Sequence, residues 1–353
     1  MKKINFTIAF ITTIIIAFSV SSCKKHDDHD SDHDNPLNIN YPAAYVVNGA
    51  SNNLSVIKLS DNTVSETIGL NGAVFPHHIY MNSKKTKLAI AITSSDLSGG
   101  HGDHTTATAG LKVQIIDAIT GIIDKEIALS KMPHNAIFNR DDSELWVGQM
   151  DTIQSQILVY NTADWTIKNT INVGRGLSEV TFSNDGLMVF ACNTMDGTIT
   201  LIDANTKMVK TTLVVGTDPV GAWSASNGNM YVDNEKSQNI SEIDVSSMSV
   251  KSTINLGFKP GYVAYHQLSG ELWVSDATNG KVVYYTLVSG VWSLQGNTVT
   301  GSDVHAIAFN SEGTKAYVTN QGTRSVSVIE VSTHKVLHTI SVGLKPNGIA
   351  LNQ

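Results

Sequence analysis

The sequence predicts an all-β fold, a seven-bladed β-propeller whose blades are four-stranded antiparallel sheets. Three observations predict it. Charged residues make up only 16% of the 353 residues, whereas about a quarter is usual, and Ser, Thr, Asn and Gly take their place. A unit of about 43 residues recurs along the chain, which is the period of a four-stranded propeller blade. The two ends of the repeat region also hold complementary parts of one unit.

The clearest repeat unit lies near the C terminus, at residues 306–343. Its short apolar or alternating runs end in Gly, Asn, Asp or Ser, which is typical of antiparallel strands joined by tight turns. The sequence shows no convincing helical period. The residues at which the first strand of each unit is predicted to begin are Pro76, Pro133, Leu177, Pro219, Pro260, Val304 and Pro346.

The closure of the ring can also be predicted. Residues 44–48 have the pattern of a second strand that lacks a first, and residues 347–352 have that of a first strand that lacks a second. Pairing them completes one mixed blade and removes the open sheet edges that would otherwise invite aggregation. The propeller is therefore expected to span residues 44–353, with the C-terminal strand closing the N-terminal blade.

One repeat carries a motif that points to a family. Residues 317–320 spell Tyr-Val-Thr-Asn, and residues 45–48 and 231–234 are looser copies. In this the chain resembles the YVTN-family β-propellers of the surface-layer type, over essentially residues 44–353. The resemblance implies a propeller fold, and it says little about function because such propellers serve as binding scaffolds, surface proteins and occasional enzymes.

The N-terminal segment is predicted to be a lipoprotein signal peptide, residues 1–22. Lysines at positions 2 and 3 precede an apolar run at residues 8–20, which is too short for a spanning helix. The sequence Val20-Ser21-Ser22-Cys23 resembles a bacterial lipobox, which implies that Cys23 is lipidated and becomes the first mature residue. An ordinary signal peptide followed by an incidental cysteine is the alternative.

Residues 23–43 are predicted to form a tether between lipid and propeller. The segment is polar and alternates Asp with His between residues 26 and 34, so it is interpreted as a solvated spacer. The alternation also gives it weak capacity for transition metals. Acidic residues just after the cysteine resemble the surface-export signal of some bacterial lipoproteins. The predicted location is the outer membrane, facing the periplasm or the cell surface, with the lipid as the membrane contact.

The net charge and the cysteine content argue against a nucleic-acid partner and against a disulfide framework. The net charge of −7 argues against nucleic acid as a partner, because phosphates need a basic face. The chain has two cysteines, Cys23 and Cys192. Lipidation of the first leaves Cys192 as a small core residue and no disulfide framework. A monomer is expected.

Function is expected where one repeat differs from the others, and the differences here involve histidine. The largest is an insertion at residues 94–110, between the second and third strands of the second blade, which carries His101, Asp103 and His104. Three further histidines, His77, His134 and His305, occupy the first position after the start of an inner strand in blades two, three and seven. Both features belong to the face around the mouth of the central channel.

Imidazoles and a carboxylate that converge from separate strands are suited to zinc or copper. A metal site formed by His77, His134, His305, His101, His104 and Asp103 is therefore predicted, although each histidine alone is better explained by hydrogen bonds to neighbouring loops. Because side chains alternate along a strand, only one of His77 and His78 is expected to face the axis, and alignment favours His77. Three methionines near this face, Met132, Met150 and Met195, shift the preference slightly toward copper.

Three functions remain open. The favoured interpretation is a lipid-anchored, non-enzymatic module that binds a metal, small molecule or protein at the channel mouth. The second is a hydrolase similar to the seven-bladed lactonases, in which His134, Arg175, Glu179 and His305 would supply acid–base and electrostatic groups. The third is a surface protein for adhesion. No lactonase motif, Ser-His-Asp set, phosphate loop or dinucleotide fingerprint is recognisable.

Overall fold

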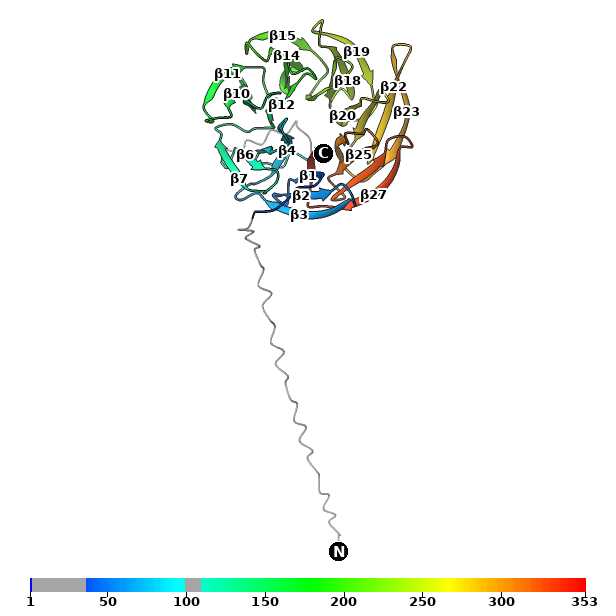
Figure 1. The fold of residues 1–353 in the computed structure, drawn as a ribbon. Helices are drawn as coiled ribbons and strands as arrows, with labels where there is room; N and C mark the ends of the chain where they lie inside the picture. The colour runs from blue at the N-terminus through cyan, green and yellow to red at the C-terminus, as the bar shows by residue number, and fades with distance from the viewer. Residues whose placement is uncertain (2–35, 99–108) are drawn as a thin grey trace. The chain divides into compact units, whose positions relative to one another are not determined.

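The computed structural model describes residue 1 and residues 36–98 and 109–353. The chain divides into two units, residues 1–36 and residues 37–353. The second unit is all-β and holds seven four-stranded antiparallel sheets that follow one another around a ring (Figure 1). The predicted signal peptide, Cys23, His101, Asp103 and His104 lie outside the described residues.

Each blade has an inner, a second, a third and an outer strand, which pair in that order. The inner strands are β28 (Pro346–Asn352), β4 (Pro76–Met81), β8 (Ala136–Phe138), β12 (Leu177–Phe182), β16 (Pro219–Ser224), β20 (Pro260–His266) and β24 (Val304–Phe309). The second strands are β1 (Ala43–Asn48), β5 (Lys87–Ile92), β9 (Glu144–Gln149), β13 (Met188–Asn193), β17 (Asn229–Asn234), β21 (Glu271–Asp276) and β25 (Lys315–Asn320).

The third and outer strands complete the blades. The third strands are β2 (Asn53–Lys58), β6 (Lys112–Asp117), β10 (Gln156–Asn161), β14 (Thr198–Asp203), β18 (Asn239–Asp244), β22 (Lys281–Val288) and β26 (Ser325–Glu330). The outer strands are β3 (Thr63–Gly69), β7 (Ile123–Ala128), β11 (Ile167–Asn172), β15 (Val209–Val214), β19 (Ser249–Asn255), β23 (Val291–Val299) and β27 (Lys335–Ser341). Helix in the described residues is limited to one 3₁₀ turn, η1 (Thr194–Asp196). None of the described helix is long and apolar enough to cross a membrane.

The predicted closure is confirmed. Strand β28 pairs antiparallel with β1, so the first blade combines the last strand of the chain with the first three. Inner strands begin where the sequence predicted in six of the seven blades. The exception is the third blade, where β8 begins at Ala136 rather than at Pro133 because Pro133, His134 and Asn135 do not join the ladder with β9. The compact unit that contains the propeller begins at Leu37, and its first strand begins at Ala43.

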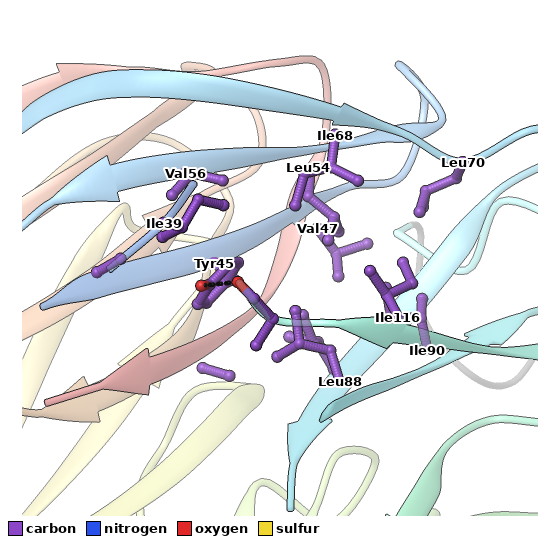
Figure 2. Close-up of a cluster of buried hydrophobic side chains, with 14 of the residues drawn as sticks. Ile39, Tyr45, Val47, Leu54, Val56, Ile68, Leu70, Leu88, Ile90 and Ile116 are labelled. Carbon is purple, nitrogen blue, oxygen red and sulfur yellow. Dashed lines mark hydrogen bonds between the residues drawn. The ribbon is translucent and has the colours of Figure 1, made fainter. Parts of the chain in front are cut away.

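Apolar side chains from neighbouring blades fill the spaces between the sheets. Figure 2 shows the cluster between the first and second blades, in which Tyr45, Leu54, Leu88 and Ile90 are fully buried. The Tyr45 hydroxyl donates to the carbonyl of Ala118, so this ring is buried without an unsatisfied polar group. Burial of each such side chain stabilises the fold by about 1.5–3 kcal/mol, which makes the inter-blade contacts the main source of stability.

A repeated asparagine fixes the turn between the second and third strands. In the fifth blade, the Asn234 amide donates to Asn239 and Ser241, and its Oδ1 accepts from the backbone N–H of Gly216 in the preceding blade. A Cβ on Gly216 would lie 2.6 Å from Asn234, so glycine is required there. We call this arrangement the asparagine clasp. The asparagines that bond in the same way to residues five and seven positions later are Asn48, Asn193 and Asn320.

The inner strands share an irregularity just after they begin. The ladder between an inner strand and its neighbour shifts register there in six blades, and the skipped residues form a β-bulge that turns their side chains off the alternating pattern. The residues skipped by the ladder are His78, Ser178 and Glu179, Val220, Gly261, His305 and Ala306, and Asn347.

Candidate functional site

The bulge in β4 brings two adjacent histidines to the same place. His78 has a φ of +41°, a conformation that a non-glycine residue seldom adopts, and the ladder skips it between His77 and Ile79. The rings of His77 and His78 stack with their centroids 4.2 Å apart. Both rings also lie beside His134, with centroids 4.6 and 4.9 Å away. The expectation that only one of them faces the channel is therefore wrong, because alternation does not continue through a bulge.

His134 approaches this pair from the third blade. It lies just before β8, in a segment that does not pair, and it is 1% exposed. Nitrogen atoms of His77, His78 and His134 lie within 4.8 Å of one another. These three residues are the group among the described residues that has the composition and spacing to hold a metal ion.

A buried carboxylate lies behind the histidines. Oε2 of Glu179, a bulge residue of β12, lies 2.8 Å from Nδ1 of His134 and 3.3 Å from Nδ1 of His78. Because an ionised carboxylate only accepts hydrogen bonds, both Nδ1 atoms carry the proton. When each imidazole is neutral, a proton on Nδ1 leaves the ring lone pair on Nε2. Nε2 of His78 is buried and has no hydrogen-bond partner within residues 36–98 and 109–353.

The electrostatic state of Glu179 is set by these neighbours. Burial alone would raise its pKa, but His78 and His134 outweigh that penalty and hold the pKa of Glu179 well below its usual range. The Tyr80 hydroxyl donates to the other oxygen, Oε1. Burial, and then the charge of Glu179, raise the pKa of Tyr80 well above its usual value, so the phenol remains a donor. Glu179 is therefore a fixed negative charge that orients two imidazoles.

His305 is the fourth histidine of the cluster. It is a bulge residue of β24, and its Nδ1 lies 2.7 Å from the carbonyl oxygen of Asn347, to which it donates. Its ring centroid lies 6.3 Å from that of His77 and 5.6 Å from that of His78. We refer to His77, His78, His134 and His305 as the histidine cluster. A backbone carbonyl orients His305, whereas a carboxylate orients His78 and His134.

Aromatic rings support the cluster from within the channel. The Trp223 ring lies near His78, and it contacts the Tyr262 ring at a tilt of 36°, with centroids 3.7 Å apart. The Trp223 indole N–H donates to Asp233 over 2.6 Å, which fixes the ring. This position requires Gly221, since a Cβ there would lie 2.3 Å from the indole. The cluster thus has a rigid, largely apolar floor.

Other sequence-predicted residues take no part in the site. Met132 and Met150 pack with Leu97 and Leu111 in an apolar cluster beneath the ends of the insertion. Their thioethers are therefore accounted for by packing, and the structure gives the preference for copper no support. Met195 is 42% exposed.

Arg175, a candidate for the hydrolase interpretation, is also directed elsewhere. Its guanidinium pairs with Asp196 at 2.6 Å on the surface. His266, His334 and His338 have structural or solvent contacts outside the histidine cluster. His266 bonds Ser269 and Gly313, His334 pairs with Glu271, and His338 is exposed on β27.

The sequence does not predict the full roles of two residues of the site, His78 and Glu179. Strand alternation favours His77 over His78, and the hydrolase interpretation gives Glu179 an acid–base or electrostatic role rather than that of orienting two imidazoles. A signal for both was present, because His78 and Glu179 occupy the same second position after the start of their inner strands. That position is bulged in both blades.

The geometry gives the site two chemical capacities. Three imidazoles backed by a carboxylate form a nitrogen donor set of the kind that binds zinc or copper. The hydrogen-bonded pair His134–Glu179 also has the composition of a general base.

Comparisons with known proteins support the fold. No protein-family model matches the sequence, and a search of curated proteins finds no relative. Solved structures do match. A functionally unknown protein from Desulfotomaculum acetoxidans aligns with a TM-score of 0.70 at 13% identity, over 88% of this chain and 98% of that one. The periplasmic gluconolactonase of Pseudomonas aeruginosa aligns with a TM-score of 0.69 at 15% identity, over 88% and 99%.

A third similar structure is a 6-phosphogluconolactonase candidate from Bacteroides fragilis. It aligns with a TM-score of 0.69 at 12% identity, over 90% of this chain and 100% of that one. Likeness at such identities concerns the fold alone. The resemblance to the YVTN family stays a prediction from its motif.

Proposed function

We propose that this protein is an extracytoplasmic binding module that holds one copper or zinc ion at the histidine cluster. The observation that carries the proposal is the convergence of His77, His78 and His134 on one buried point, with Glu179 bonded to Nδ1 of two of them. Metal-bound histidines commonly donate their second ring N–H to a carboxylate, which fixes the tautomer and makes the ligand more basic.

The charges at the site favour a cation. Glu179 is fully buried and ionised, and a buried negative charge is stable only when it is paired. A divalent ion on the Nε2 side of the rings would be balanced by the carboxylate on the Nδ1 side. Metal–nitrogen bonds of about 2.1 Å would draw the three rings slightly together. Three protein ligands leave a coordination position open for His305 or a small ligand.

The test uses the full chain with the tether histidines replaced: His26→Ala, His29→Ala and His33→Ala. This protein should copurify with or take up about one copper or zinc ion, as expected for a single preformed site. Because the ion binds only the folded state, it should raise the melting temperature. Replacing His78 and His134 together with Ala should abolish uptake.

The matched control is His338→Ala, which removes an exposed histidine of β27 and should leave uptake unchanged. Calorimetry and metal analysis on the same preparations provide the measurements. A tether-substituted protein that takes up neither metal, or a double variant that still binds it, would overturn the proposal.

A second candidate function is lactone hydrolysis. It is favoured by the hydrogen-bonded His134–Glu179 pair and by the gluconolactonase among the similar structures. Hydrolysis of gluconolactone in the presence of EDTA, abolished by Glu179→Gln, would support it. Activity that depends on added metal would instead assign the chemistry to the ion.

We also propose that Cys23 anchors the protein to the outer membrane through lipid. The proposal is supported by the lipobox-like sequence at residues 20–23. Cys23→Ala should shift the protein from the membrane fraction to the soluble fraction. Cys192→Ala, which alters a buried core cysteine, is the control and should remain in membranes. Membrane retention of the Cys23 variant would contradict the anchor.

A further inference from the structure

A cavity lies at the other end of the inner strands from the histidine cluster. Ser178 and Thr181 of β12 donate to the carbonyls of Val220 and Ala222 of β16, so these inner strands run in the same direction. The cluster belongs to the first residues of the inner strands. The cavity, of about 530 Å³, is lined by their last residues and by the turns that follow.

Three aromatic side chains belong to both places. Tyr80, Trp223 and Tyr262 line the cavity. In the other direction Tyr80 donates to Glu179, Trp223 lies near His78, and Tyr262 lies near His305. These rings separate the cavity from the histidine cluster, so the cavity is a second compartment rather than part of the cluster.

The walls of the cavity are suited to a flat apolar group. Besides the three shared rings, Phe138, Phe182 and Tyr265 line it. Aromatic faces attract other rings in offset or edge-to-face arrangements, with a gain beyond the area that they bury. The volume falls within the range of small-molecule pockets.

The rim of the cavity carries one kind of charge. Arg140 is exposed and lines the cavity, and no acidic side chain is among the described residues that line it. The guanidinium is held in place by a 2.9 Å bond to the carbonyl of Asp185, which leaves most of its five N–H groups available. The Asp185 carboxylate itself accepts from Ser183 and Leu187 and does not line the cavity.

We propose that this cavity binds an aromatic carboxylate, with the ring between the aromatic walls and the carboxylate on Arg140. The ring of such a ligand would contact the six aromatic residues of the cavity wall. Its carboxylate would accept hydrogen bonds from the planar guanidinium of Arg140. A neutral sugar would also stack on the rings, but it would not form an ion pair with Arg140 at the rim. The site is independent of the metal site, because none of its contacts requires an ion.

The experiment compares two probes of the same shape on the full chain. Binding of 2-naphthoate and of its neutral analogue 2-naphthamide is measured by titration calorimetry, with and without EDTA. We expect the carboxylate to bind about tenfold more tightly than the amide, as one charge-assisted contact allows. Arg140→Gln should remove that difference and leave amide binding unchanged. Ser224→Trp, which places a large ring at an exposed position of the cavity lining on β16, should abolish binding of both probes.

Arg324→Gln is the matched control, because Arg324 is exposed in the turn between β25 and β26 and does not line the cavity. It should bind both probes as the unaltered protein does. Equal binding of the two probes, an Arg140→Gln variant that keeps the preference, or no binding of either probe would each overturn the proposal. Displacement of naphthoate by D-glucose would also overturn it, in favour of a carbohydrate site. Loss of binding on addition of EDTA would contradict its independence from the metal.

Discussion

The turn after the second strand differs between the four blades with the asparagine clasp and the two blades that supply His77, His78 and His134. In the fifth blade, Asn234 clasps residues five and seven positions later and also reaches Gly216 of the blade before it. In the second blade, β5 ends at Ile92, which pairs with Pro76 where the clasped blades have asparagine, and β6 begins only at Lys112. The third blade has Gln149 at that position. The sixth blade has Asp276 there. The histidine pair and His134 come from two of the three unclasped blades.

The difference has a geometric cause. An asparagine side chain can bond both residues only when a tight turn returns the chain directly to the third strand, and a long insertion separates those partners. A long insertion therefore excludes the clasp, although a tight turn can also lack it, as the turn from Asp276 to Lys281 in the sixth blade does. The two blades that supply His77, His78 and His134 lack the clasp, whereas Glu179 and His305 come from clasped blades. Loops on a rigid scaffold are the usual place for functional specialisation.

The largest expected effect comes from breaking a clasped blade at its inner edge. Deleting residues 347–353 removes β28, although Asn48 keeps the clasp of the first blade intact. The deletion exposes apolar contacts of Ile349, Ala350 and Leu351. Burial of such side chains is worth up to about 1.5–3 kcal/mol each, and a whole domain is stable by only about 5–15 kcal/mol. Thermal unfolding followed by circular dichroism should therefore show no native-like transition. A truncated protein that melts with the full chain would show that ring closure contributes little.

A smaller effect is expected from breaking the clasp alone. Asn234→Ala leaves the backbone N–H of Gly216 and the side chains of Asn239 and Ser241 without their partner. Loss of a buried hydrogen-bond partner costs about 1–3 kcal/mol, so the variant should unfold at lower urea concentration. Asn205→Ala, an exposed asparagine in the turn after β14, is the control and should stay within about 0.5 kcal/mol. If the two variants unfold at the same urea concentration, the hydrogen bonds of the repeated clasp do not contribute to stability.

The same comparison explains what the sequence could predict. The ring of seven blades, its closure and six inner-strand starts follow from repeated residues, because strands and tight turns leave a periodic pattern. The third inner strand and the orientation of His78 were predicted wrongly. Both lie in the unclasped blades, and both depend on local backbone departures, an unpaired segment at His134 and a positive φ at His78. Such departures are set by packing around the channel and have no signature in single-residue preferences.

The smallest expected effect concerns what replaces the clasp in the third blade. Asp151 follows β9 and accepts from the backbone N–H groups of Ile153 and Gln154, while Lys131 lies 2.6 Å from its other oxygen. The hydrogen bond from Lys131, followed by those backbone bonds, lowers the pKa of Asp151 from 3.8 to about 2. A carboxyl whose pKa is lower in the folded state stabilises the fold above its unfolded pKa, and that contribution disappears as the pH falls through the folded value.

Asp151→Asn keeps an acceptor oxygen but removes the charge. The stability difference between this variant and the unaltered protein should be constant from pH 7 to about pH 4 and should shrink toward pH 2. Because the pair is at the surface, the difference should be small and should decrease with added salt. Asp164→Asn is the control, since the pKa of Asp164 is lowered by its bonds to Thr166 without a lysine, and its effect should not depend on salt. Urea unfolding at several pH values and two salt concentrations measures both. A salt-independent difference at Asp151 would mean that the unclasped turn is held by hydrogen bonds alone, as the clasped turns are.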